Sequence, residues 1–182
     1  MELDSQSEIY SLAVTRDGTK IISSEESGMI KVWDVESHEL VKEWTHPEGG
    51  AEIAISPDDR LISVGVWSVA IYSMEGRQVG HSIEAQVDDG DWLSSMTFSP
   101  DGKKLACATH DTANIRVYDV DSGTLILGPL RGHHRVRVVL WSRDGSRIFS
   151  SGDNTIRCWN SDTGKQTGHP HHRYNKYLIN PL

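Results

Sequence analysis

The chain has 182 residues and a formal net charge of −8, and this length is enough for one domain with a sizeable core. The acidic excess argues against sequence-independent binding to nucleic acid and against adhesion to anionic membranes, because both need a basic surface. No apolar stretch of about 18 residues and no basic, apolar leader is present, so we predict neither a transmembrane helix nor a signal peptide and expect a cytoplasmic protein, with the nucleus left open.

A turn signal recurs along the chain and divides it into four units. Its aspartates, at positions 17, 58, 101 and 144, are 41, 43 and 43 residues apart. An aromatic residue follows each aspartate after 14 to 17 residues, and these residues are Trp33, Tyr72, Tyr118 and Trp159. Two landmarks that keep step over four units indicate an internal repeat, and a period of this length is typical of propellers and solenoids.

Each unit contains four short apolar or alternating runs separated by polar turns, which is the pattern of β-strands. We predict strands at 9–15, 20–24, 29–33 and 40–44 in the first unit, and at 51–56, 60–65, 68–72 and 78–83 in the second. We predict strands at 94–99, 103–109, 114–118 and 124–130 in the third unit, and at 137–142, 147–151, 155–159 and 165–169 in the fourth, where the last run is the weakest.

Four strands per repeat predict an all-β fold. A single four-stranded antiparallel blade cannot bury both of its faces, whereas blades stacked radially as a β-propeller can. We expect about four blades, at 8–46, 47–88, 89–132 and 133–169, within a single domain. The first two runs of each unit are nearly all apolar, so we expect inner strands covered on both faces. The fourth run is the most polar, so we expect an outer edge strand.

The fourth unit carries the motifs of a known family. These motifs are Gly132-His133, Ser142-Arg143-Asp144-Gly145, Ser150-Ser151-Gly152-Asp153 and Trp159-Asn160. Over residues 8–169 the sequence resembles the WD-repeat family. The resemblance implies a buried hydrogen-bonded tetrad of His133, Asp153, Trp159 and one serine, either Ser150 or Ser151. The other units keep the aromatic position but not the full set, so the resemblance implies one intact tetrad.

WD-repeat propellers usually close with more blades than four, so the resemblance raises the question of closure. Three readings are open: a fragment of a longer propeller, an open arc completed by another chain or a second copy, and a closed four-bladed ring. In an incomplete propeller, exposed blade flanks would allow self-association. We expect residues 170–182 to begin a truncated fifth repeat or to form a tail.

Two charged loops are candidates for binding a protein partner. The basic and acidic residues concerned are Arg131, His134, Arg135 and Arg137, and, one repeat earlier, Asp88, Asp89 and Asp91. The family geometry puts both loops on one face of the disc, where opposite charges would orient a partner. The alternative is that these are ordinary solvated loops that pair weakly with each other.

Two tryptophans, Trp67 and Trp92, fall in predicted loops on this same face. An exposed tryptophan is a common anchor of protein interfaces. The alternative is that both side chains cap a small propeller core. The sequence leaves both interpretations open.

The sequence favours neither catalysis nor metal binding. It has no Gly-x-Ser-x-Gly motif, no phosphate-binding glycine loop and no His-Glu-x-x-His motif. The recurring aspartates are explained by turn chemistry. The histidines at 169, 171 and 172 raise a metal site as a distant alternative to a polar loop. We therefore predict no enzyme activity, no cofactor and no metal.

The function that the sequence favours is a non-catalytic scaffold for protein–protein interaction, as a fragment or module of a larger propeller protein. The alternative is a ligand-sensing repeat module of a larger signalling protein. We expect other proteins as partners, and neither nucleic acid nor a membrane.

Overall fold

A computed structural model describes residues 7–85, 90–168 and 171–172. These residues form four antiparallel sheets of four strands each, and every sheet follows the chain as a simple meander. The prediction of an all-β chain built from four-stranded antiparallel blades is confirmed. Within the described part of the chain, no helix is long and apolar enough to cross a membrane.

The strands lie close to the predicted runs. The first two blades contain β1 (Ile9–Val14), β2 (Lys20–Glu25), β3 (Met29–Asp34), β4 (Leu40–Thr45), β5 (Glu52–Ile55), β6 (Leu61–Gly65), β7 (Ser68–Ser73) and β8 (Ile83–Glu84). The last two contain β9 (Leu93–Phe98), β10 (Lys104–Thr109), β11 (Ile115–Asp119), β12 (Leu125–Leu130), β13 (Val138–Trp141), β14 (Arg147–Gly152), β15 (Thr155–Asn160) and β16 (His171–His172).

The fourth strands of the second and fourth blades depart from the prediction. The run 78–83 was predicted as a strand, yet only an isolated bridge from Gln78 to Tyr72 precedes β8. The run 165–169 was predicted as a strand, yet after a bridge from Gln166 to Trp159 the regular pairing resumes only at β16. Gly80 and Gly168 have φ angles of 70° and 76°, a conformation that takes the backbone out of a strand ladder.

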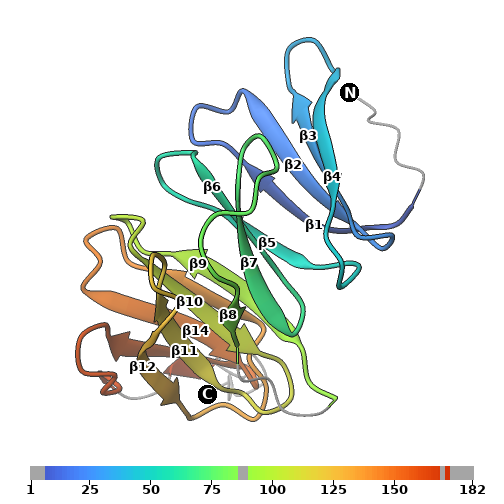
Figure 1. Cartoon of the computed structure of the whole chain (residues 1–182). Helices are drawn as coiled ribbons and strands as arrows, with labels where there is room; N and C mark the ends of the chain where they lie inside the picture. Colours follow the sequence, from blue (N-terminus) through green and yellow to red (C-terminus); the bar gives the residue numbers. More distant parts are fainter. Residues whose placement is uncertain (1–6, 86–89, 169–170, 173–182) are drawn as a thin grey trace, which may run out of the picture.

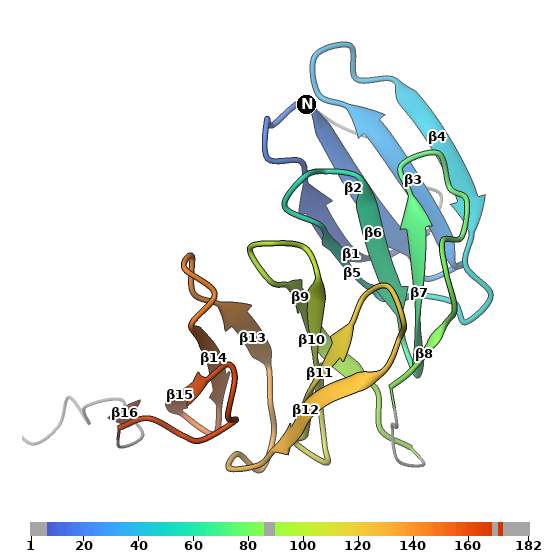
Figure 2. The same ribbon diagram turned by 60° about the vertical axis from the view of Figure 1, so that its left-hand side comes forward.

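The blades follow one another as an arc (Figure 1). The first strands lie side by side along its inner edge in the order β1, β5, β9 and β13 (Figure 2). The prediction that first strands are covered on both faces is wrong for the two end blades. Leu12 and Val14 of β1, and Val138 and Leu140 of β13, are all more than 40% exposed. A blade flank is buried by a neighbouring blade, and among the described residues no further blade packs on these two flanks.

Three apolar clusters hold the arc together, one between each pair of neighbouring blades. The first joins Ile22 of β2 to Ile62 of β6, and the second joins Ile71 of β7 to Leu105 of β10. The third joins β10 and β11 to Ile148 of β14. Successive residues of a strand point to opposite faces, so each middle blade supplies both of its interfaces. Fully burying such a side chain stabilises the fold by about 1.5–3 kcal/mol.

The turns between the first and second strands explain the recurring aspartates. In each blade the hydroxyl two residues earlier donates to the aspartate carboxylate, over 2.8, 2.6, 2.5 and 2.6 Å at Asp17, Asp58, Asp101 and Asp144. Hydrogen bonds from the turn hold the pKa of Asp17 and Asp144 at about 2. These carboxylates are therefore engaged in shaping turns.

Candidate functional site

The antiparallel strands bring two kinds of connection to the same end of the arc. One kind joins the last strand of a blade to the first strand of the next, and the other joins the second and third strands of one blade. We call this end the loop face and define it by residues 46–51, 66–67, 90–92, 110–114, 131–137 and 153–154. The opposite end carries the aspartate turns, and we call it the turn face. All of the described residues predicted for docking lie on the loop face.

A hydrogen-bonded chain anchors the loop face of the fourth blade. The indole N–H of Trp159 donates to Ser150 Oγ over 2.9 Å, and Ser150 Oγ lies 2.9 Å from His133 Nε2. The other ring nitrogen of His133 lies 3.3 Å from Thr155 Oγ1. The structure thus brings His133, Ser150 and Trp159 together, and Ser150 rather than Ser151 lies between the two rings.

The positions of the protons in this hydrogen-bonded network follow from the donors and acceptors that its members provide. Trp159 can only donate, so the single hydroxyl proton of Ser150 is free to go to His133 Nε2. The hydroxyl of Thr155 donates to the carbonyl of Gly152 over 3.0 Å, so we assign the proton of His133 to Nδ1, where the oxygen of Thr155 can accept it. Burial, together with Arg157, lowers the pKa of His133, while Asp153 at 3.9 Å from Nδ1 acts in the opposite direction. His133 is neutral at pH 7 and completes the network as acceptor and donor.

The other three blades use shorter versions of this network. Each repeat aromatic makes one hydrogen bond, and the pairs are Trp33 Nε1 to Ser23 Oγ at 3.0 Å, Tyr72 Oη with His46 Nδ1 at 3.2 Å, and Tyr118 Oη to Ala85 O at 3.0 Å. The aromatic position thus keeps its polar function where the rest of the tetrad is missing.

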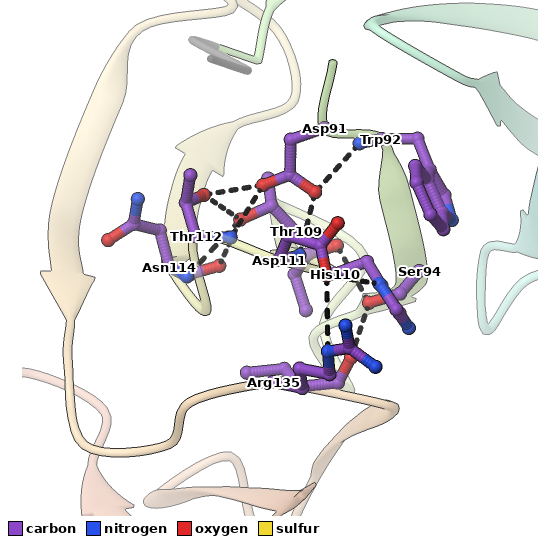
Figure 3. Close-up of polar contacts among 11 residues, drawn as sticks. Asp91, Trp92, Ser94, Thr109, His110, Asp111, Thr112, Asn114 and Arg135 are labelled. Atoms are coloured by element: carbon purple, nitrogen blue, oxygen red, sulfur yellow. Dashed lines mark hydrogen bonds and ion pairs between the residues drawn. The ribbon is translucent and has the colours of Figure 1, made fainter. Parts of the chain in front are cut away.

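Asp91 fastens the third blade's loops to each other. Its carboxylate accepts the Asp111 N–H at 2.8 Å, and the Thr112 N–H and hydroxyl at 2.9 and 2.5 Å (Figure 3). It also accepts the N–H of Trp92 at 2.8 Å. Burial alone would raise the pKa of Asp91, but these hydrogen bonds outweigh it and lower the pKa. Asp91 was predicted to contact a partner; it is 2% exposed, and its carboxylate is occupied within the chain.

Glu48 makes the same connection in the second blade. Its carboxylate accepts the hydroxyl of Ser68 at 2.6 Å and the N–H groups of Trp67 and Ser68 at 3.1 and 3.3 Å. In the fourth blade the direction is reversed, since Asp153 accepts the backbone N–H of His134. Glu48 was not among the functional residues predicted from the sequence. The sequence feature that could have identified it is an acidic residue placed about half a repeat before the turn that it binds.

The basic loop stays near the surface and is partly paired. Arg131 Nε donates to Asn114 Oδ1 over 3.2 Å. Arg135 Nε lies 3.2 Å from Asp111 Oδ1, as Figure 3 shows. Arg135 and Asp111 remain 60% and 44% exposed, so this contact between the third and fourth blades is worth little in free energy. Asp88 and Asp89, the other acidic residues predicted for docking, lie outside the described residues.

A cavity of about 760 Å³ opens on the loop face. Its lining includes the aromatic side chains of Tyr10, Trp67 and Trp92 and the charged side chains of Glu48, Glu52 and Arg137. Trp67 and Trp92 are 56% and 42% exposed and belong to none of the three buried clusters, so neither side chain caps the core. One face of Trp92 stacks on the His110 ring at 4.6 Å and 13°. This volume is in the ordinary range of ligand-binding pockets.

The histidine-rich segment is described only in part. His171 and His172 pair through their backbones with Ile156 and Thr155, while His169 lies outside the described residues. Among the residues that the structure describes, no group of three or more His, Cys, Asp and Glu side chains is placed to hold a metal ion.

Two protein-family models match the chain. One, described as "WD domain, G-beta repeat", matches residues 124–160 and therefore includes the third strand of the fourth blade. The other, described as "Lactonase, 7-bladed beta-propeller", matches residues 17–141. Both descriptions agree with the blade architecture.

Several known proteins are similar in sequence over most of the chain. A ciliary WD repeat-containing protein, ctxp80, of Euplotoides octocarinatus is 30% identical over 82% of this chain and 24% of its own length. Echinoderm microtubule-associated protein-like 2 of Rattus norvegicus is 26% identical over 87% of this chain and 25% of its own. Apoptotic protease-activating factor 1 of the same species is 31% identical over 83% of this chain and 12% of its own. The chain spans a quarter or less of these relatives.

Proposed function

Because the chain belongs to the WD-repeat β-propeller family, we propose that it is a non-catalytic scaffold that docks a protein partner on its loop face. The chain is a propeller segment that matches part of larger WD-repeat proteins. Two of these relatives are named for microtubules and for apoptotic proteases, which are different partners. Because these names differ, we propose only the binding surface, which is the loop face, and the mode of binding, which is docking of a protein.

The observation that carries this proposal is that side-chain carboxylates hold neighbouring connections of the loop face to one another. Glu48, Asp91 and Asp153 each join two connections of the loop face through carboxylate hydrogen bonds. Loops held in one arrangement lose less conformational entropy when a partner binds, so more of the contact energy appears as affinity. Trp67 and Trp92 stay exposed on these fastened loops, and exposed tryptophans in such positions are frequent anchors of interfaces.

The basic loop supplies the charge that would orient the partner. Arg131, Arg135 and Arg137 project from one connection of an otherwise acidic chain. A local positive patch of this kind favours an acidic segment of the partner and speeds its approach at low salt. We infer that this loop selects the orientation of the partner and that the tryptophans contribute most of the affinity.

Hydrolysis of a lactone is the competing function, because one of the two matching family models has that name. Several carboxylates of the chain already have internal tasks: the recurring aspartates shape turns, and Glu48 and Asp91 fasten loops. This use of the acidic groups supports binding over general acid–base chemistry. A lactone hydrolysis assay on the purified chain, with activity above the uncatalysed rate, would overturn the non-catalytic part of the proposal.

The test of docking is quantitative affinity capture from cells. The triple variant R131E/R135E/R137E should reduce the recovered amount of any specific partner about tenfold or more, because it reverses the orienting charge. The matched control is R16E/K103E/R143E, which makes the same charge change at exposed positions on the turn face. Equal recovery by wild type and the loop-face variant, or equal losses in the two variants, would contradict docking on the loop face.

We propose the cytoplasm as the place of action. This agrees with the name of one relative as a microtubule-associated protein.

A further inference from the structure

We propose that the loop-face cavity receives a basic side chain, lysine or arginine, presented by the protein partner. This inference rests on the proposed docking function and deepens it by assigning the chemistry of one pocket. It follows from the aromatic side chains around the cavity and from the balance of charge on its walls.

Three aromatic side chains meet at this cavity from separate parts of the arc. Tyr10 comes from β1, Trp67 from the turn between β6 and β7, and Trp92 from the connection before β9. All three are exposed, at 59%, 56% and 42%. The negative faces of aromatic rings attract ammonium and guanidinium groups, most strongly where the site is sheltered from water. Three such rings at one cavity therefore favour a cation.

The charged groups of the cavity wall are mostly acidic. Glu48, Glu52 and Asp91 contribute carboxylates, and Arg137 contributes one guanidinium group. Glu48 and Asp91 each receive at least three hydrogen bonds, which lower the pKa of both groups and keep them ionised. The wall is therefore negative at neutral pH, and a positive group entering it is attracted.

Glu52 is the carboxylate that a bound cation would contact to the greatest benefit. It lies at the start of β5 and has one side-chain hydrogen bond among the described residues, from Ser11 Oγ over 3.2 Å. Partial burial raises the pKa of Glu52. A carboxylate in a sheltered place with so few partners is poorly compensated. A lysine or arginine head group would supply the missing positive charge.

Other occupants fit the wall less well. An acidic side chain would face three carboxylates with only Arg137 in its favour. A purely apolar side chain would gain contact with the aromatic rings but would remove water from Glu52 without replacing its hydrogen bonds. A basic side chain satisfies both the rings and the carboxylates.

The test uses small probes of the side chain in solution. N-acetyl-arginine amide and N-acetyl-lysine amide are titrated into the ¹⁵N-labelled chain, and N-acetyl-citrulline amide serves as the neutral isostere of arginine. The indole N–H signals of Trp67 and Trp92 should shift and saturate with the two cations and stay unmoved with citrulline. The signals of Trp33 and Trp159, which are hydrogen-bonded to serines, should stay unmoved throughout.

Two variants make the test specific. Glu52→Gln should bind the arginine probe about tenfold more weakly, because it removes the poorly compensated charge. Its matched control is Glu36→Gln, an exposed position on the turn face, which should bind as wild type does. The same spectra report whether each variant is folded.

Three results would overturn the assignment. These are equal shifts with the arginine and citrulline probes, equal affinities of the two glutamine variants, and, when choline is titrated in the same way as a quaternary ammonium probe, tighter binding of choline than of either cationic amino-acid amide. If capture of a partner depends on the charges of the basic loop and any of these three results is also obtained, docking on the loop face is retained. The assignment of a basic side chain to the cavity is then wrong.

Discussion

The carboxylate of Asp91 accepts both the backbone N–H and the hydroxyl of Thr112, at 2.9 and 2.5 Å, although the two residues are 21 positions apart. Thr112 belongs to the turn between β10 and β11, and Asp91 belongs to the connection that enters β9. One buried side chain therefore holds two neighbouring connections of the loop face together. Trp92 follows Asp91 directly, so the same bonds position an exposed aromatic residue of the cavity.

Asp91→Ala should therefore destabilise the chain strongly. It leaves three N–H groups and one hydroxyl without their charged acceptor, and we expect a loss of about 2–4 kcal/mol in the free energy of unfolding. Urea unfolding measures this change directly. The control is Asp121→Ala, an exposed aspartate on the turn face, for which we expect a change within about 0.5 kcal/mol. Equal effects of the two substitutions would mean that the Asp91 bonds contribute nothing specific.

Ser150 and Ser151 should differ sharply in their contributions to stability. Ser150→Ala removes the acceptor of Trp159 and the partner of His133, both buried, so we expect a loss of about 2–3 kcal/mol. Ser151→Ala removes a hydroxyl that has no hydrogen bond among the described residues, and a change within about 0.5 kcal/mol is expected. Urea unfolding of both variants decides the matter, and a larger loss in Ser151→Ala would contradict the network.

Glu52 should lower the stability of the chain at neutral pH. Partial burial raises its pKa above the ordinary value of 4.5, so the folded chain holds this proton more tightly than the unfolded chain does. The contribution of Glu52 protonation to the free energy of unfolding is therefore fully present below pH 4.5, and it is lost as the pH rises through the folded-state pKa. Glu52→Gln imitates the protonated form and should be more stable than wild type at about pH 7, by less than about 1 kcal/mol because solvent screens the charge.

This pH effect is checked by urea unfolding at about pH 4 and about pH 7, with Glu36→Gln as the control. The advantage of Glu52→Gln should disappear at the lower pH, where Glu52 is protonated in both states. A constant advantage at both values would show that a difference in packing, and not the charge, is responsible. A stability gain accompanied by weaker binding of the arginine probe is the result expected of a residue kept for binding.

The sequence predicted the strands well because their signals are local. Alternation of apolar residues and the aspartate turns mark each blade within a few residues, and the first three strands of every blade lie where these signals put them. The same alternation separates Ser150 from Ser151 once the register is known, since Ser150 pairs opposite Arg157 and shares its face with Trp159. The sequence alone left this choice open because a Gly-containing turn follows at once.

The loop connections could not be predicted in the same way. The bonds of Asp91 and Glu48 join positions about 20 residues apart, and they depend on how two connections approach each other at one end of a blade. The meeting of Tyr10, Trp67 and Trp92 depends further on the packing of neighbouring blades. The exposure of Leu12 could be expected only for an incomplete propeller, because burial of a blade flank depends on a neighbour and not on the strand's own composition.

Site-specific photo-crosslinking in living cells tests the central claim, docking on the loop face, most directly. A photoactivatable benzoyl-phenylalanine replaces His134, an exposed residue of the basic loop, or Ile126, an exposed residue on the outer strand β12. We predict a discrete crosslinked protein from position 134, lost in the R131E/R137E background, and none from position 126. Adducts from position 126 alone would contradict docking on the loop face, and adducts from position 134 that persist when the charges are reversed would contradict the orienting function of the basic loop.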